Sequence, residues 1–145
     1  MKKLFATLAA AAMLGVSAVC SASFGTVLDA EHAAVDKFTS AKDFKAVSGL
    51  LHEDMKANFT EDNFNKFREI VGTNFGVLRG KTLRIVEKLD DADVLRYQAH
   101  FDKEPNAEYV FAFRVVGGKP LLFDFNLIKP QQQNSEAPAA AEQGK

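Results

Sequence analysis

The stretch AEYVFAFRVVGGKPLLFDFNLI, residues 107–128, alternates large apolar side chains with polar or small ones on both sides of a glycine pair. Alternation with a period of two predicts a β-strand that buries one of its faces. Gly117 and Gly118 can take the positive φ angles that a two-residue hairpin turn requires. The sequence therefore predicts two antiparallel strands, at 107–116 and 120–128, joined by this turn.

Two more strands are expected before this hairpin, at 83–89 and 94–102. Turn residues separate them at 90–93, and a second turn at 104–106 leads into the strand that begins at Ala107. Short loops between successive strands require antiparallel neighbours. The simplest arrangement is a four-stranded meander.

The phase of the alternation predicts which side of this sheet is buried. The expected inner face consists of Leu83, Ile85, Leu95, Tyr97, Ala99, Phe101, Tyr109, Phe111, Phe113, Val115, Leu121, Phe123, Phe125 and Leu127. The expected outer face is a polar and apolar mixture that includes Arg84, Arg96, Gln98, His100, Arg114, Asp124 and Asn126.

The residues before the strands have a helical period instead. Asp29, Asp43 and Thr60 are each placed to begin a helix, because their side-chain oxygens can accept hydrogen bonds from the free amides of a first turn. We expect Gly72 to end the third helix. The apolar sides of the three helices are expected at Ala30, Ala34, Phe38 and Ala41, then Phe44, Val47, Leu50 and Leu51, then Phe64, Phe67, Ile70 and Val71. Helices followed by strands give an α+β domain, with the helices on one face of the sheet.

Both ends of the chain differ in composition from this domain. Residues 1–23 combine Lys2 and Lys3 with a long run of apolar and small residues, as a cleavable signal peptide does, and cleavage after Ala22 or Ser23 fits best. The alternative is a lipoprotein anchored at Cys20. Residues 130–145 are polar and alanine-rich, which is typical of a disordered tail. The expected organisation is a signal peptide at 1–23, one domain at 24–129 and a tail at 130–145, in a periplasmic or secreted protein.

Charge and composition narrow the range of partners. Removing Lys2 and Lys3 from the 18 Lys and Arg, against 19 Asp and Glu, leaves a net charge of about −3. A nucleic-acid partner would require a basic surface, so none is expected. No segment after the signal peptide is apolar over enough residues to cross a membrane.

The order of elements resembles the nuclear transport factor 2-like superfamily. The residues that carry this resemblance are Phe59-Thr60, Asn63-Phe64, Phe67, Val71-Gly72 and Gly76, ahead of a long strand, and the likeness extends over 28–128. It is closer to the small domains of this shape found in secreted bacterial proteins. The resemblance implies helices wrapped on a curved sheet in the shape of a cone. The superfamily includes isomerase-like enzymes, ligand-binding modules and assembly domains, so the resemblance implies no single activity.

No catalytic or cofactor signature is present in the sequence. The predicted inner face contains no Asp, Glu or His, and only Tyr97 and Tyr109 place polar atoms there, as a weak candidate pocket for a small apolar ligand. His32, His52 and His100 are too far apart in sequence to suggest a metal site, and no cofactor is expected.

The outer face offers a second candidate, a surface for a partner or for another copy of the chain. It would consist of Arg96, Gln98, His100, Arg114, Asp124 and Asn126, although ordinary solvation also explains these residues. The sequence therefore favours an exported, non-enzymatic module that binds a small ligand or assembles with itself or another envelope protein. The alternative is a small isomerase- or hydrolase-like enzyme that uses the interior of the cone.

Overall fold

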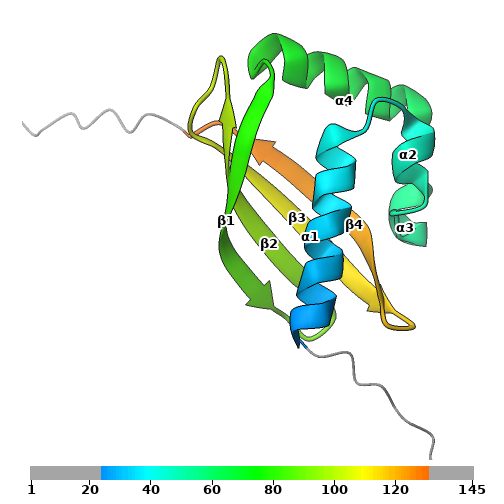
Figure 1. The fold of residues 1–145 in the computed structure, drawn as a ribbon. Helices are drawn as coiled ribbons and strands as arrows, with labels where there is room; N and C mark the ends of the chain where they lie inside the picture. Colours follow the sequence, from blue (N-terminus) through cyan, green and yellow to red (C-terminus); the bar gives the residue numbers. More distant parts are fainter. Residues whose placement is uncertain (1–23, 131–145) are drawn as a thin grey trace, which may run out of the picture.

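The computed structural model describes residues 24–130, which form an α+β domain as predicted (Figure 1). Four helices precede four strands: α1 (Phe24–Ser40), α2 (Phe44–Ser48), α3 (Glu53–Lys56), α4 (Glu61–Asn74), β1 (Leu78–Lys88), β2 (Asp93–Phe101), β3 (Ala107–Val116) and β4 (Lys119–Ile128). The predicted signal peptide at 1–23 and the predicted tail, apart from Pro130, lie outside the described residues. Within 24–130, no helix is long and apolar enough to cross a membrane.

The sheet is the expected antiparallel meander, with the order β1-β2-β3-β4. The helix α1 lies across one face of the sheet, and α4 crosses near the end where β1 begins (Figure 1). Gly117 and Gly118 have φ angles of 59° and 79°, which confirms the predicted hairpin turn between β3 and β4. Residues 50–52 run along the edge of β4, where the amide of His52 donates to the carbonyl of Leu122 over 2.7 Å.

Two of the three predicted helix starts are confirmed. The Asp43 side chain accepts a hydrogen bond from the amide of Ala46 at 2.9 Å, and the Thr60 hydroxyl accepts one from the amide of Asn63 at 3.4 Å. Gly72 does not end the third predicted helix, which corresponds to α4, because α4 continues to Asn74. Glycine adopts helical angles as well as positive φ angles, so Gly72 can lie inside a helix. The positive φ angle is at Gly76 instead, just after α4.

The first helix differs from its prediction. It begins at Phe24, so Asp29 lies inside it instead of capping it. Ala30 is exposed, and the buried side of α1 carries Glu31, Ala34, Val35 and Phe38. These four positions follow the three- and four-residue spacing of one helix face, displaced by one residue from the predicted stripe.

Two β-bulges reverse parts of the predicted sheet faces. In β1, Leu83 lies opposite Tyr97 and Ile85 opposite Arg96, so one extra residue is present at Arg84. In β4, Asp124 lies opposite Ala112 and Leu122 opposite Phe113, so the extra residue is Phe123. A single extra residue moves the following side chains to the other face. Four residues predicted to face inward therefore do not form the core: Ile85, Leu121 and Phe123 lie beyond or at a bulge, and Val115 is exposed near the hairpin turn. Val86 and Leu122 take inner positions instead.

The core between the helices and the sheet is rich in aromatic side chains. Phe38 of α1 is at its centre, with ring centroids of Phe125, Phe111 and Phe67 at 4.8, 5.7 and 6.2 Å. The remaining buried side chains include Val35, Val47, Leu51, Phe64, Leu95, Tyr97, Phe101, Tyr109 and Phe113. Edge-to-face and tilted ring pairs of this kind add to the stabilisation from apolar burial.

Candidate functional site

An aromatic cleft of about 200 Å³ opens at the end of the core where β1 begins. Its walls come from α1, α4 and the ends of β1, β2 and β3. We call it the aromatic cleft. The side chains that dominate it are Phe38, Phe64, Phe67, Phe101 and Tyr109, with Thr39 and Arg68 as the polar contributors besides the tyrosine.

Tyr109 is the polar group inside the aromatic cleft. Its side chain is buried, and its ring stacks on Phe111 with centroids 5.1 Å apart. Within residues 24–130, its hydroxyl makes no hydrogen bond. Burial raises the pKa of Tyr109 above its ordinary value, so the hydroxyl stays protonated and remains a donor. The hydroxyl oxygen keeps some exposed surface toward the open cleft, so a molecule from solution can accept a hydrogen bond from it.

Gly76 allows the chain to turn from α4 into β1 at the mouth of the aromatic cleft. Its φ angle is +83°, and a Cβ placed there would lie 1.7 Å from Oδ1 of Asp102. The same oxygen accepts a hydrogen bond from the amide of Val77 at 2.9 Å. Only glycine satisfies both the positive φ and the close approach, so this turn fixes how the cleft opens.

Arg68 lies at the edge of the aromatic cleft on α4. Its Nη1 donates to the carbonyl of Lys42, and its guanidinium carbon lies 5.8 Å from the centroid of the Phe64 ring. Among the residues that line the cleft, Arg68 is the one with a charged side chain. The cleft therefore combines an apolar interior with one positive charge at its edge.

Tyr97, the other tyrosine of the predicted pocket, is in a different environment. It lies directly opposite Tyr109 in the sheet, but it is fully buried and its hydroxyl lies 2.7 Å from Nδ1 of His32 on α1. Nε2 of His32 lies 4.0 Å from Asp36, which also binds Lys81. The hydrogen bond from Lys81 lowers the pKa of Asp36, and burial, followed by the charges of Asp36 and Glu31, raises the pKa of Tyr97. The structure does not bring the two hydroxyls into one pocket.

The prediction that no acidic group faces the interior is wrong. Asp93, at the start of β2, is buried in phase with Leu95 and Tyr97, and Glu31 of α1 has no exposed surface at all. Burial, and then the neighbouring Asp93, raises the pKa of Glu31 to about 8. The sequence contained a signal for Glu31, because it precedes Ala34, Val35 and Phe38 at helical spacing on one face. The turn predicted at 90–93 includes Asp93, whereas in the structure Asp93 begins β2.

The six residues of the predicted partner face do not form one surface that is free to bind a partner. Arg96 and Gln98 of β2 are already engaged with neighbouring strands, since Arg96 pairs with Glu87 and Glu108 and Gln98 accepts from Arg84. The side chains of His100, Asp124 and Asn126 are exposed and make no hydrogen bond or ion pair with another described residue. In the sheet register, Asn126 and Arg96 flank the same residue, Val110.

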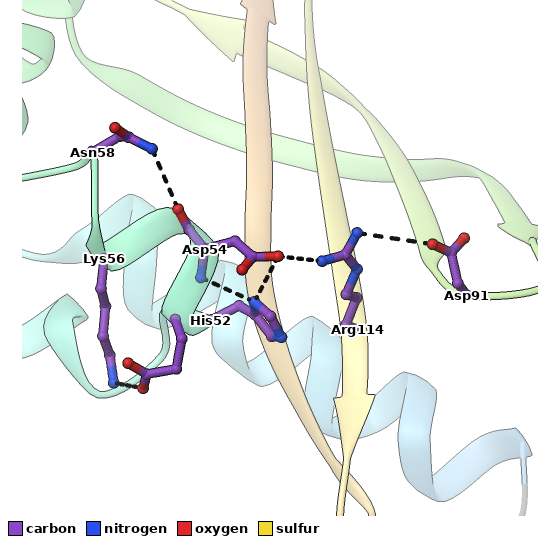
Figure 2. Close-up of polar contacts among 7 residues, drawn as sticks. His52, Asp54, Lys56, Asn58, Asp91 and Arg114 are labelled. Atoms are coloured by element: carbon purple, nitrogen blue, oxygen red, sulfur yellow. Dashed lines mark hydrogen bonds and ion pairs between the residues drawn. The ribbon is translucent and has the colours of Figure 1, made fainter.

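Arg114, the sixth residue of this face, connects distant parts of the chain instead (Figure 2). Its guanidinium binds Asp54 of α3 at 2.5 Å and approaches Asp91, in the turn between β1 and β2, at 3.8 Å. The same group lies 4.4 Å from the centroid of the Phe123 ring. His52 caps α3 by accepting from the amide of Asp54 at 3.2 Å. This network gives Arg114, which ordinary solvation was enough to explain in the sequence, a structural role.

The described part of the chain contains no group of three or more His, Cys, Asp or Glu side chains that could hold a metal ion.

Comparisons with known proteins provide little beyond this geometry. No family model matches the chain, and no curated protein matches it. Among solved structures, the chain is similar to one from Kribbella flavida DSM 17836, described as a "known function protein". The two are 18% identical with a TM-score of 0.48, over 73% of this chain and 88% of the other. No function is transferred from a similarity of this size.

Proposed function

We propose that this protein is an exported, non-enzymatic module that binds a small and largely apolar molecule in the aromatic cleft. The observation that carries the proposal is the hydroxyl of Tyr109, which has no partner among the described residues and meets an apolar opening from an otherwise buried side chain. Ligand sites in proteins typically combine apolar walls with a few placed polar groups, and this cleft has that composition. The resemblance to nuclear transport factor 2-like domains is consistent with such a site.

The size of the cleft limits the ligand. A volume of about 200 Å³ is below the range of roughly 300–1,000 Å³ that is typical for drug-sized ligands. A single ring or a short branched chain fits, with a carbonyl or ether oxygen to accept from Tyr109. Arg68 at the edge would favour an acidic substituent that points toward solvent.

Binding is better supported than catalysis, because the cleft lacks a base. Its lining contains no carboxylate and no histidine, so a bound molecule would meet no group suited to removing a proton at neutral pH. An enzyme that uses the aromatic cleft would need a carboxylate beside Tyr109. The buried carboxyl groups, Glu31 and Asp93, gather where β2 begins, whereas Tyr109 and Phe101 line the cleft near the opposite end of the sheet.

Native mass spectrometry of the protein purified from its own periplasm tests this proposal. We expect a retained small molecule that is absent from the variant Ala41→Phe, which places a ring in the cleft from a half-buried position in its lining. The matched control is Ala33→Phe, at an exposed position on α1. Retention of the same molecule by Ala41→Phe would rule out the cleft as its site. The mass of the chain would also show whether residues 1–22 or 1–23 have been removed.

Assembly through the outer face of the sheet is a second candidate function, and one observation favours it. Ile85 and Ile128 are 49% and 40% exposed on this face. Arg96, opposite Ile85, forms an ion pair with Glu108, opposite Ile128. Large apolar side chains beside paired charges are suited to a second copy of the chain or to another envelope protein.

Light scattering after size-exclusion chromatography tests assembly. A dimer through this face should dissociate in Arg96→Glu, because the substitution places a third negative charge beside Glu87 and Glu108. A monomer at every concentration, unchanged by Arg96→Glu, would exclude self-assembly by this surface and leave the ligand proposal unaffected.

A further inference from the structure

A cluster of three charged side chains, of which Glu31 and Asp93 are buried, lies at the end of the sheet opposite the aromatic cleft. Glu31 comes from α1, Lys88 ends β1 and Asp93 begins β2, directly opposite Lys88. Glu31 is 0% exposed and Asp93 is 8% exposed. Lys88 forms an ion pair with Asp93, and its Nζ lies 3.9 Å from Oε2 of Glu31.

Glu31 lacks the hydrogen bonds that a buried carboxylate needs. Neither of its carboxyl oxygens has a hydrogen-bond partner, and the distance of 3.9 Å to Lys88 exceeds that of a hydrogen bond. An ionised carboxylate in such a place would be costly, because burial removes its hydration without a replacement. The single ammonium of Lys88 would also have to balance two negative charges. Some donor is therefore missing from this cluster.

We propose that Glu31 carries a proton at neutral pH, and that the hydrogen bond it can then donate to Asp93 fastens α1 to the sheet. The proton provides the missing donor, since a protonated carboxyl group can donate to a carboxylate. One negative charge remains on Asp93, and Lys88 balances it. Glu31 is then neutral, as its burial requires.

The surrounding groups support this assignment. Lys88 of β1 and Asp93 of β2 are the charged groups that act on Glu31, and Tyr97 of β2 is the phenol near enough to sense its charge. Burial and Asp93 raise the pKa of Glu31, whereas Lys88 lowers it, and the raising effects are larger. Within 24–130, no third acid or histidine joins the pair to make a metal site.

Loss of the proton would loosen α1. Glu31 and Asp93 would then both be charged beside one ammonium, with Glu31 cut off from solvent, and α1 could relieve this by moving its first turns away from β1 and β2. The same helix carries Phe38 in the wall of the aromatic cleft. An alkaline environment would therefore disturb a wall of the cleft from the other end of the molecule, whether or not the cleft binds a ligand.

Carboxyl-carbon NMR of the full chain labelled with ¹³C-glutamate tests the proton on Glu31. The signal of Glu31, assigned by its absence in Glu31→Gln, should titrate near pH 8, well above the ordinary value of 4.5. If every glutamate signal titrates together near the ordinary value, the proposal is wrong. Should Glu31→Gln fail to fold, the labelled wild type still decides, because a single late-titrating glutamate signal is either present or absent.

Hydrogen exchange tests the link to α1. After correction for intrinsic rates, amides of α1 should lose protection between about pH 7 and about pH 9 in the wild type and keep it in Glu31→Gln. The matched control is Glu69→Gln, an exposed glutamate of α4, which should behave as the wild type does. Equal profiles in wild type and Glu31→Gln would overturn the fastening role.

Discussion

One end of the core is open and aromatic, whereas the other is sealed and charged. Each contains a polar group that the described residues leave without a hydrogen bond: the hydroxyl of Tyr109, which reaches the aromatic cleft, and the carboxyl of Glu31, which has no exposed surface. At the open end a molecule from solution can meet the unpaired group, so the consequence is binding. At the sealed end only a proton can reach it, so the consequence is a shifted titration. Access, more than polarity, decides what an unpaired buried group does.

The largest expected effect on the free energy of unfolding comes from replacing Gly76, in the turn at the mouth of the aromatic cleft. Gly76→Ala should lower the free energy of unfolding by about 3 kcal/mol, because the residue has a positive φ and its Cβ would collide with Asp102. Chemical denaturation measures this. The matched control is Gly72→Ala within α4, where a Cβ meets nothing within 4 Å. It should raise stability by about 0.5–1 kcal/mol. Equal effects of the two substitutions would contradict this geometry.

The sealed end should produce the next largest effect, and it depends on pH. The pKa of Glu31 is about 8 in the folded protein against 4.5 for an ordinary glutamate. The group therefore binds its proton more tightly when folded, and its contribution to stability, complete below pH 4.5, is lost as the pH rises through about 8.

Glu31→Gln removes this loss, because its amide stays neutral and can donate to Asp93. We expect the variant to become more stable than the wild type as the pH rises toward 8, and to differ little from it at pH 4.5. Urea denaturation across this range provides the difference. A difference that does not change with pH would contradict a titrating Glu31.

Tyr97 and Tyr109 lie in neighbouring strands, and the hydroxyl of only the first has a hydrogen-bond partner among the described residues. Tyr97→Phe should cost about 1 kcal/mol, because it removes the hydrogen bond with His32. Tyr109→Phe should change stability by less than about 0.5 kcal/mol, because no described residue bonds to its hydroxyl. Thermal or urea denaturation distinguishes them. A large loss in Tyr109→Phe would mean that its hydroxyl has a partner.

The smallest effect is expected at the surface. Asp54→Asn weakens the contact with Arg114 that joins α3 to β3, at a carboxylate that is largely exposed (Figure 2). We expect a loss of about 0.5 kcal/mol that shrinks as salt is added. Denaturation at low and high salt measures it, and a loss that is independent of salt would exclude an electrostatic origin.

Local patterns were sufficient for much of the fold. The predicted limits of β3 coincide with its observed ones, because alternation and a glycine turn are encoded within this hairpin. Asp43 and Thr60 cap their helices through contacts three residues away. The bulges at Arg84 and Phe123 were not predictable, since an extra residue is defined by the strand opposite, which the local alternation does not reveal.

The candidate site was less accessible to sequence reasoning for a similar reason. Tyr97 and Tyr109 occupy equivalent positions in the alternation, and only the placement of His32 on α1 separates the paired hydroxyl from the unpaired one. Burial of Glu31 depends on Asp93 and Lys88, which lie far along the chain. A carboxylate on an apolar helix face is ordinarily expected to reach solvent.

The binding of two simple probes tests the central claim most directly. Acetophenone and ethylbenzene have similar shapes, but only the first has a carbonyl that can accept from Tyr109. In NMR titrations, acetophenone should bind about fivefold more tightly, shift amides at Val71, Phe101 and Tyr109, and lose its advantage in Tyr109→Phe. The claim is contradicted if neither probe shifts these amides, or if acetophenone keeps its advantage in Tyr109→Phe.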